Sequence, residues 1–380
     1  MIKRTLQELC LNITDGKHGD CENEENSGYY FISCKDIFDG QINYKNARQI
    51  TKADFEETHK RTMLEVDDIL LTNSGTIGRM AFVTDREATT KTTFQKSVAI
   101  IKPDKQKVLP RYLYYQLQNC VPQFINSSNG SAQKNLLLST MRTFQIEIEE
   151  NCEKQEKIAN TLSAYDDLIE NNQKQIKLLE EAAQRLYKEW FVDLRFPGHE
   201  NTKIVDGVPE GWSRTNINEI LTFHRGYDLT KNEMKAGRYP VVGSTTVIGY
   251  HNEFKIKGPG IVTGRSGSLG KYQFIWDNFW PHNTSLYISD YKDHNIFFVY
   301  SLLQTVDFAS LNNGGAIPTL NRNVLSNIEV IEPTDELQEM FAKIAEPQYQ
   351  KIKNLEKQND KLKTARDLLL PKFMSGEVEV

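Results

Sequence analysis

Apolar and aromatic side chains recur at alternating spacings of four and three residues through the middle of this chain. The series comprises Ile158, Leu162, Tyr165, Ile169, Ile176, Leu179, Ala183, Leu186 and Trp190, with Asn172 in the remaining slot. This spacing predicts one long amphipathic helix whose apolar seam must pack against another helix. At about 1.5 Å per residue the helix would be roughly 50 Å long, too long for the interior of one small domain. We therefore interpret it as a spacer between domains.

A second stretch, near the C-terminus, repeats the same spacing. Its seam positions are Ile352, Leu355, Asn359, Leu362, Leu369 and Phe373. Superposing the two series places Ile169 on Ile352 and Trp190 on Phe373. A long helix after each half of the chain indicates an internal duplication, and such a repeat determines the whole fold. Pro347 is expected to interrupt the second helix near its start, because proline lacks the N–H donor of a helix interior.

The two helices are expected to pack antiparallel within one chain. We predict the register in which Asn172 lies opposite Asn359, which also places Tyr165 opposite Arg366 on the flank. A buried Asn pair costs stability but penalises slipped registers, in which one Asn would meet an aliphatic side chain. The alternative is that each Asn lies on the solvated border of the seam.

Length and composition set the broad class. A chain of 380 residues predicts two to three domains, and its net charge of −5 argues against a basic, nucleic-acid-binding composition overall. The five cysteines form no C-x-x-C pair, which favours free thiols in a reducing cytosol. Cys10, His18, Cys21 and Cys34 match no standard zinc spacing. The longest apolar stretch is too short to cross a bilayer, so a soluble cytoplasmic protein is expected.

Each half reads as short strands separated by turn residues, followed by one helix and a polar loop. The first half has expected strands at 29–33, 69–72, 80–83, 98–101 and 144–148, with a helix at 110–119. The second half has expected strands at 239–242, 260–263, 272–276, 285–288 and 328–331, with a helix at 295–305. This mixture predicts an α+β fold with two repeated domains and two long antiparallel helices that form an intramolecular coiled coil.

The halves also share a turn motif. Ser74-Gly75-Thr76-Ile77-Gly78-Arg79 matches Ser266-Gly267-Ser268-Leu269-Gly270-Lys271, and residues 97–100 match residues 285–288. The second copy has the wrong spacing for a phosphate-binding loop, and neither copy opens a helix. We read both as tight turns between strands. No catalytic triad, metalloprotease motif or acidic metal cluster is apparent in the sequence, so no metal site is expected.

Polar loops that carry bases and amides are candidates for contacts to DNA phosphates and base edges. In the first half these candidates are Lys17, His18, Arg79, Lys91, Lys96, Asn129 and Lys134. In the second half they are His224, Arg225, Tyr227, Ser244, Thr245, Thr246, Arg265, Lys271, Asn313, Asn321 and Arg322. For any one of them a solvated surface role is the plainer reading, and the set is suggestive because it occurs twice at matching places.

The chain resembles the DNA-specificity subunits of type I restriction–modification systems over its whole length. The residues that carry this resemblance are Asp15-Gly16-Lys17-His18-Gly19, the Ser74–Arg79 turn, Gln155-x-Lys157-Ile158, Trp190-Phe191-Val192-Asp193, Pro209-Glu210-Gly211-Trp212 and the C-terminal string Arg366–Glu377. The first half begins without its own Pro-Glu-Gly-Trp entry.

The resemblance implies two target-recognition domains that each read one half of a bipartite DNA site. It places the first domain at residues 1–150, the first spacer helix at 151–191, the linker and second domain at 192–334, and the second spacer helix with the tail at 335–380. It implies a non-catalytic subunit without a cofactor of its own. Its partners would be double-stranded DNA, two methyltransferase subunits that use S-adenosylmethionine, and restriction subunits that use ATP and Mg²⁺.

Two other classes of function are weighed against this one. A non-catalytic coiled-coil scaffold that spaces two interaction modules would explain two near-neutral domains. A self-contained nuclease or methyltransferase is disfavoured because its motifs are missing. Salt-dependent binding to duplex DNA separates the first reading from the scaffold.

Overall fold

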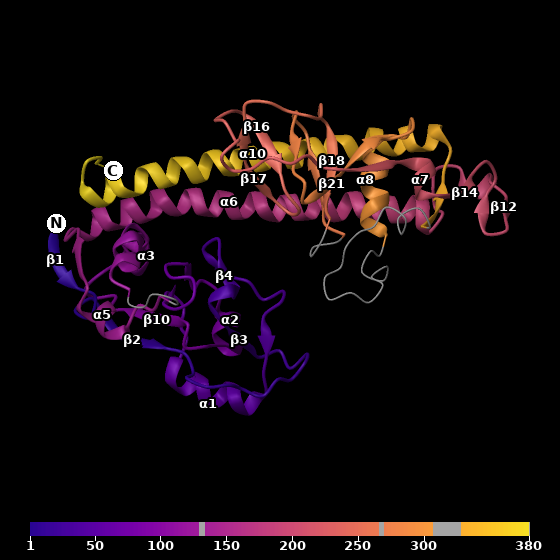
Figure 1. Cartoon of the computed structure of the whole chain (residues 1–380). Coiled ribbons are helices and arrows are strands. Elements are labelled where there is room, and N and C mark those ends of the chain that lie inside the picture. The colour runs from indigo at the N-terminus through magenta and orange to yellow at the C-terminus, as the bar shows by residue number, and fades with distance from the viewer. Residues whose placement is uncertain (129–133, 266–269, 307–327, 380) are drawn as a thin grey trace. The chain divides into compact units, whose positions relative to one another are not determined.

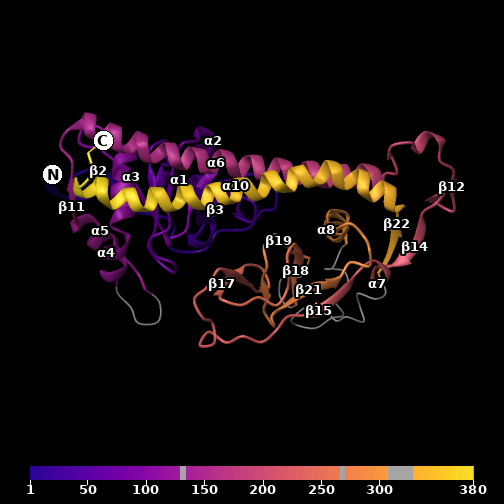
Figure 2. The same ribbon diagram turned by 90° about the horizontal axis from the view of Figure 1, so that it is seen from above.

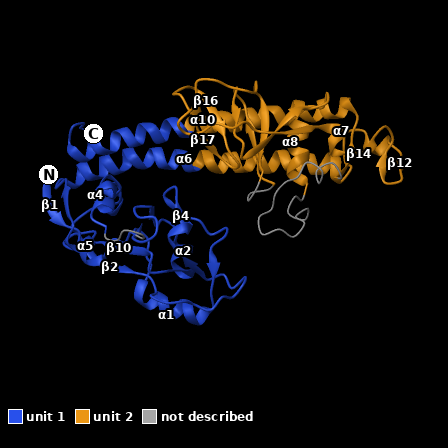
Figure 3. Cartoon of the chain, viewed as in Figure 1, with its two compact units in different colours: residues 1–170, 359–380 blue, residues 171–358 orange. Residues whose placement is uncertain are grey.

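The computed structural model describes residues 1–128, 134–265, 270–306 and 328–379. The chain divides into two compact units, which are coloured separately in Figure 3. Unit 1 comprises residues 1–170 and 359–380, and unit 2 comprises residues 171–358. Each unit therefore contains one end of each long helix, and each is described here by itself.

Unit 1 is built on a four-stranded antiparallel sheet with strand order β2-β10-β7-β8. A three-stranded sheet of order β6-β3-β9, in which β3 and β9 run parallel, lies beside it, and β1 pairs with β11. The strands are β1 Ile2–Thr5, β2 Cys10–Asp15, β3 Tyr30–Ile32, β4 Ile37–Phe38, β5 Gln41–Ile42, β6 Arg48–Gln49, β7 Ile69–Thr72, β8 Met80–Phe82, β9 Thr92–Phe94, β10 Val98–Pro103 and β11 Gln145–Ile148. The helices are α1 Lys52–Thr62, α2 Arg86–Lys91, α3 Pro110–Asn119, α4 Val121–Asn126 and α5 Leu138–Thr143, with a 3-10 turn at Cys34–Asp36.

Unit 2 repeats this plan (Figures 1 and 2). Its four-stranded sheet has the order β15-β21-β18-β19, its three-stranded sheet has the order β17-β16-β20 with β16 and β20 parallel, and β14 pairs with β22. The strands are β12 Ile204–Val205, β13 Val208–Pro209, β14 Ser213–Asn216, β15 Thr222–Arg225, β16 Tyr239–Val242, β17 Val247–His251, β18 Gly260–Gly264, β19 Tyr272–Ile275, β20 Trp280–Pro281, β21 Ser285–Asp290 and β22 Glu329–Glu332. The helices are α7 Ile217–Ile220 and α8 Ile296–Thr305, with a 3-10 turn at His199–Asn201.

The two long helices are α6, Cys152–Tyr187, which continues as a π-helical turn at Lys188–Val192, and α10, Asp335–Ser375. In unit 1 the start of α6 and the end of α10 share one core, in which Ile158 and Phe373 are both buried. Asp166 of α6 forms an ion pair with Arg366 of α10 at 2.5 Å, within one residue of the expected Tyr165–Arg366 position. In unit 2 Leu179 packs against the core that contains Ile352, and further along α6 the ring of Tyr187 contacts Phe341, which is earlier in α10, at a centroid distance of 5.9 Å. The antiparallel arrangement of the helices is thus seen in each unit.

Both asparagines of the predicted register are buried, with 2% of Asn172 and 6% of Asn359 exposed. These exposed fractions are inconsistent with the alternative in which each Asn lies on the solvated border of the seam. Their mutual pairing stays a prediction.

One expectation about the helices needs correction. Pro347 does not interrupt the second helix, because α10 runs from Asp335 to Ser375 without a break. Pro347 is exposed, so water can solvate the carbonyl group that loses its helical donor, while the buried Phe341 and Tyr349 anchor the helix on both sides.

Helix α1 was not expected from the sequence. It buries only Phe55, Thr58 and Thr62, so its apolar periodicity is weak.

Candidate nucleic-acid interface

The ends of several strands meet at one edge of the large sheet in unit 1. Strand β2 ends at Asp15 and β7 ends at Thr72, while β8 begins at Met80 and β10 begins at Val98. Because these neighbours are antiparallel, the loops that follow or precede these residues lie side by side. We call residues 15–18, 33–34, 73–79, 95–97 and 134 the unit 1 edge.

The equivalent edge exists in unit 2. Strand β15 ends at Arg225 and β18 ends at Gly264, while β19 begins at Tyr272 and β21 begins at Ser285. We call residues 225–228, 243–246, 264–265, 271 and 282–284 the unit 2 edge. Both edges have the same strand order, so the repeat can be aligned residue by residue.

The strand pairing corrects the alignment of the repeat by one residue. Val98 pairs with Thr72, and Ser285 pairs with Gly264 at the equivalent place in the shared turn motif. Val98 is therefore equivalent to Ser285, whereas the sequence comparison had matched Ser97 to Ser285. A shift of one residue in a strand moves every side chain to the opposite face, so the correction decides which side chains are equivalent.

A glycine at the end of the first strand holds each edge together. Gly16 lies so close to the neighbouring backbone that a Cβ atom there would be 1.9 Å from the Phe94 carbonyl oxygen. Gly226 is its equivalent, with a hypothetical Cβ atom 2.1 Å from the His282 carbonyl oxygen. The residue after each glycine donates its backbone N–H across the gap, from Lys17 to Phe94 and from Tyr227 to Pro281, each at 2.8 Å. Only glycine permits this approach.

Most of the described candidates of the first half come together at the unit 1 edge. Lys17 and His18 follow β2, and Lys96 donates its backbone N–H to the Lys17 carbonyl at 3.1 Å. Arg79 lies at the turn, where its Nη1 donates to the Cys34 carbonyl at 3.4 Å. Lys134 lies beside this turn, because the next residue bridges to Ser74.

Two candidates of the first half do not join this group. Lys91 lies at the start of β9, whereas the edge is at the other end of this strand, and its Nζ atom contacts Glu87 at 2.5 Å. Asn129 lies outside the described residues.

Charge pairing inside unit 1 engages several of these bases. The Nζ atom of Lys17 donates to Asp54 at 3.0 Å and to Glu57 at 3.2 Å, both on helix α1. The hydrogen bond to Asp54 raises the pKa of Lys17 above its ordinary value, so the side chain stays charged. The carboxylate of Asp15 is buried and contacts both His18, at 2.8 Å, and Arg61.

The candidates of the second half gather in the same way. Arg225 and Tyr227 flank Gly226, Ser244 donates its hydroxyl to the Thr284 carbonyl at 2.8 Å, and Arg265 donates its backbone N–H to the same carbonyl at 3.1 Å. Thr245 and Thr246 are exposed in the turn after β16, and Lys271 is exposed before β19. Asn313, Asn321 and Arg322 lie outside the described residues.

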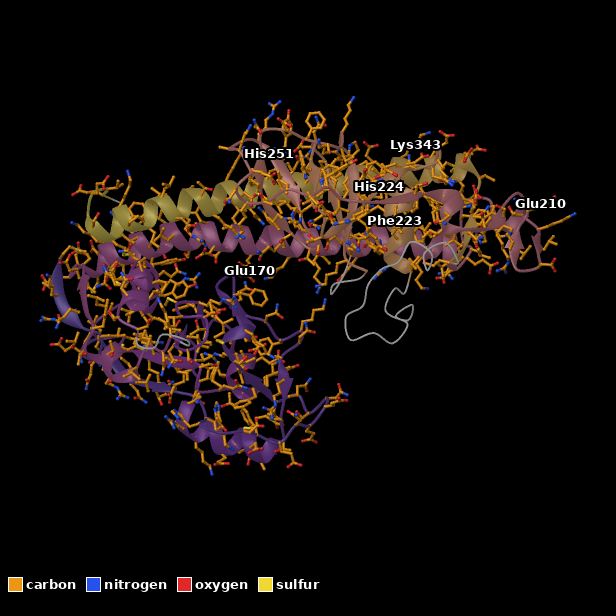
Figure 4. All side chains as sticks on the ribbon, in the orientation of Figure 1. Glu170, Glu210, Phe223, His224, His251 and Lys343 are labelled. Atoms are coloured by element: carbon orange, nitrogen blue, oxygen red, sulfur yellow. The ribbon has the colours of Figure 1, made fainter. Side chains whose placement is uncertain are left out.

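His224, which is labelled in Figure 4, differs from these residues because the alternation of strand β15 places its side chain on a face of the sheet. It is exposed, whereas its neighbour Phe223 is buried, as the alternation of a strand requires. Its ring packs against Tyr287, with the ring centroids 5.5 Å apart, and stacks on Tyr227 at 6.2 Å. The Tyr227 hydroxyl is within 3.0 Å of the Tyr287 hydroxyl, so these rings form a packed aromatic group beside the edge.

Sequence reasoning missed several residues of the two edges, among them Cys34, Asp228, His282 and Asn283. Cys34 is the equivalent of Ser244, and Asp228, His282 and Asn283 belong to the unit 2 edge. Aligning Gly16 with Gly226 would have pointed to them. The residue after each glycine, Lys17 or Tyr227, forms a β-bridge to the loop that precedes β10 or β21. The signal was a single glycine in otherwise dissimilar sequence.

The described part of the chain contains no group of three or more His, Cys, Asp or Glu residues that could hold a metal ion. Cys10 and Cys21 are buried free thiols, and Cys34 is a partly exposed one. Among the helices of the described residues, no segment has the length and apolar character needed to span a bilayer.

The two-unit plan matches a known family. The family model described as "Type I restriction modification DNA specificity domain" matches residues 3–181 and 209–364, one match for each half. The chain therefore belongs to the type I restriction–modification DNA-specificity family. DNA recognition is its role, and it is a non-catalytic subunit that assembles with other subunits of such a system and with DNA.

Individual relatives agree with this family. The chain is 27% identical over 384 residues to the type I restriction enzyme MjaIX specificity subunit of Methanocaldococcus jannaschii. This match covers 92% of this chain and 87% of that protein. It is 28% identical over 173 residues to the EcoBI specificity subunit of Escherichia coli, a match that covers 44% of this chain and 35% of that protein. The crystal structure of a type I S subunit from Mycoplasma genitalium superposes with a TM-score of 0.61 at 19% identity, covering 98% of this chain and 95% of that one.

Proposed function

We propose that the unit 1 edge and the unit 2 edge each read one half of a bipartite DNA target. The observation that carries this proposal is the repetition of the edge itself. Both units place basic and amide side chains where the same four strand ends meet, around an equivalent glycine. A rigid sheet whose loops carry variable polar side chains is suited to reading base edges.

The exposed cations are assigned to phosphates and the loop residues to bases. Lys96, Lys134 and Lys271 are exposed, and no ion pair involves them within the described ranges. We assign these three and Arg79 to backbone contacts, which fix the position of the duplex without reading its sequence. His18, Arg225 and Ser244 lie nearer the strand ends and are assigned to the base edges.

The domain limits of the proposal follow the helices. Residues 1–150 and 192–334 form the two recognition domains, and residues 151–191 and 335–380 form the spacer that sets the distance between half-sites.

The burial of Asn172 and Asn359 supports a register of the two long helices that is fixed by this pair. Replacing each by leucine, alone and together, should give a coupling free energy of about 1 kcal/mol or more in unfolding experiments. Additive effects would contradict the pairing.

Catalysis is assigned to the partners. We propose that two methyltransferase subunits, which use S-adenosylmethionine, dock on this chain, and that restriction subunits with ATP and Mg²⁺ join through them. The chain itself is proposed to act in the cytoplasm, without a cofactor of its own.

The first test identifies the target. Methylated adenines are mapped in the source genome with and without this chain. A motif of two short half-sites around a fixed gap should disappear when the chain is absent. If every methylated motif persists while the methyltransferase subunits are expressed, the proposal is wrong.

The second test locates the interface through the cysteines. Cys34 is partly exposed at the unit 1 edge, Cys152 is exposed at the start of α6, and Cys10, Cys21 and Cys120 are buried. A target duplex should slow the alkylation of Cys34 about tenfold and leave Cys152 unchanged. The variant Ser244→Cys tests the equivalent position of unit 2. Equal alkylation rates with and without the target duplex, at saturating binding, would place DNA elsewhere.

A further inference from the structure

Each edge carries an acidic and a basic side chain three residues apart, and the two edges hold them in opposite order. In unit 1 the acid comes first, with the Oδ2 atom of Asp15 2.8 Å from the Nε2 atom of His18. In unit 2 the base comes first, with the Nη2 atom of Arg225 3.6 Å from the Oδ1 atom of Asp228. Both pairs straddle the glycine at the strand end. Since Gly16 is equivalent to Gly226, Asp15 is equivalent to Arg225 and His18 to Asp228.

The surroundings of the two pairs differ as much as their polarity. The Asp15 side chain is only 8% exposed, and Arg61 and His18 occupy its two oxygens. A base edge cannot reach this carboxylate. In unit 2 the Arg225 side chain is 48% exposed and the Asp228 side chain 78% exposed. Asn283, from the loop before β21, also donates its amide to the Oδ1 atom of Asp228. Asp228 therefore connects the strand end to the neighbouring loop.

We propose that Arg225, positioned by Asp228, reads the guanine of a G·C base pair in the half-site bound by unit 2. This inference rests on the proposed function, because it requires that the unit 2 edge faces DNA. A guanidinium group can donate two hydrogen bonds to O6 and N7 of guanine in the major groove. Asp228 contacts one terminal nitrogen of this group and restricts its orientation, which reduces the entropy lost on binding.

The carboxylate also argues against a phosphate as the partner of Arg225. A DNA phosphate in contact with this guanidinium would approach Asp228, and two anions repel each other. The major-groove edge of a G·C pair, in contrast, is attractive to both side chains. It offers the O6 and N7 acceptors of guanine to the arginine and the N4 amino donor of cytosine to the aspartate. The pair Arg225–Asp228 is therefore complementary to G·C and poorly matched to the backbone.

The equivalent position of unit 1 lacks this complementarity. There the exposed member is His18, with 59% of its side chain exposed, and the acid beneath it is buried. The two half-sites should therefore differ at the base pairs that these equivalent positions contact.

The experiment measures sequence preference with the full-length chain assembled with type I methyltransferase subunits. Adenine methylation is scored on duplex libraries in which one half-site at a time is randomised. Arg225→Ala should reduce the preference for guanine at one position of one half-site by about 10- to 100-fold, as expected for a lost bidentate contact. Arg225→Lys should reduce the same preference less than Arg225→Ala and retain overall binding, because lysine keeps the charge and can still donate to O6 and N7 but lacks the planar fork. Asp228→Asn should weaken the preference several-fold.

Arg214→Ala is the matched control. Arg214 lies on β14 of the same unit, its side chain is also 48% exposed, and its Nη1 atom is 4.0 Å from a carboxylate oxygen of Glu329. This control should leave every base preference unchanged. Thermal unfolding midpoints verify that all variants fold.

Two outcomes would overturn the inference, and they can be told apart. A uniform loss of binding for all sequences in Arg225→Ala, with a smaller dependence on salt, would make Arg225 a phosphate contact. The interface would then stand and the guanine assignment would fall. If Arg225→Ala and Ser244→Ala both behave like the control, the unit 2 edge does not face DNA, and the proposed interface falls with it.

Discussion

The two units share one sheet but support its edge by different means. In unit 1, helix α1 lies against the edge and pairs its charges, with Asp54 and Glu57 contacting Lys17. In unit 2, the segment between β16 and β18 is described throughout and holds strand β17 and no helix. Aromatic rings, including Tyr227 and Tyr287, pack beside that edge instead. The sheet thus fixes where contacts are made, and its insertions set their chemistry.

The attachment of each domain to the long helices also differs, with charged groups in unit 1 and aromatic rings in unit 2. In unit 1 the hydroxyl of Tyr115 on α3 donates to Asp166 of α6 at 2.6 Å, and Asp166 also binds Arg366 of α10. In unit 2 the equivalent helix α8 meets α10 through rings, with Phe297 stacked on Tyr349 at a centroid distance of 5.7 Å. The attachment in unit 1 is a charged hydrogen-bond network, whereas the attachment in unit 2 combines stacked rings with a neutral hydrogen bond between Ser301 and Tyr349.

The largest expected effect tests whether the two edges are independent. Gly16→Ala forces a Cβ atom into the Phe94 backbone, and Gly226→Ala does the same at His282. Each should destabilise its own unit by about 2–4 kcal/mol, as overpacked sites do. Hydrogen exchange measured by mass spectrometry should report faster exchange only in the unit that carries the substitution.

Gly28→Ala is the control for these substitutions. Gly28 has a positive φ of 79°, but nothing lies within 4 Å of its hypothetical Cβ atom, so only backbone strain of about 1 kcal/mol is expected. If Gly16→Ala costs no more than this control, the close approach is not required. If it also accelerates exchange throughout unit 2, the edges are not independent.

A smaller effect separates the two attachments. Asp166→Asn removes the charge that Arg366 and Tyr115 share and should cost about 2 kcal/mol of unfolding free energy, because the arginine side chain is only 23% exposed. Ser301→Ala removes the hydrogen bond between Ser301 and Tyr349 of unit 2 and should cost about 1 kcal/mol or less. Chemical denaturation of both variants measures the difference. Equal costs would mean that the network in unit 1 contributes no more than a neutral hydrogen bond.

The smallest effect concerns helix α1. Glu57→Gln removes one carboxylate from Lys17 and should tighten binding to the target duplex about two- to threefold, the range of an exposed ion pair. Glu56→Gln on the same helix is the matched control, because Glu56 pairs with Lys52 instead. Titrations at one fixed salt concentration make the comparison. Equal affinities for the two variants would show that α1 does not moderate the charge of this edge.

The sequence by itself determined the features that depend on local periodicity. The heptad spacing predicted both long helices, and alternation bounded by turn residues predicted β7 at Ile69–Thr72 and β16 at Tyr239–Val242. The helix at Pro110–Asn119 was predicted at its observed ends because proline opens it. These signals lie within a few residues of the element that they specify. Helix α1 shows the limit of prediction from local periodicity, since its face toward the sheet is largely polar.

Only the tertiary structure decided which candidates share a site. Lys91 and Lys96 are five positions apart in the sequence, yet Lys96 lies at the unit 1 edge and Lys91 lies at the opposite end of β9. Asp228 and Asn283 are far apart in the sequence and in contact in space. The physical reason is that strand pairing joins distant segments, and a register shift of one residue changes which side chains meet. The reversed pairs at Gly16 and Gly226 became visible only through that register.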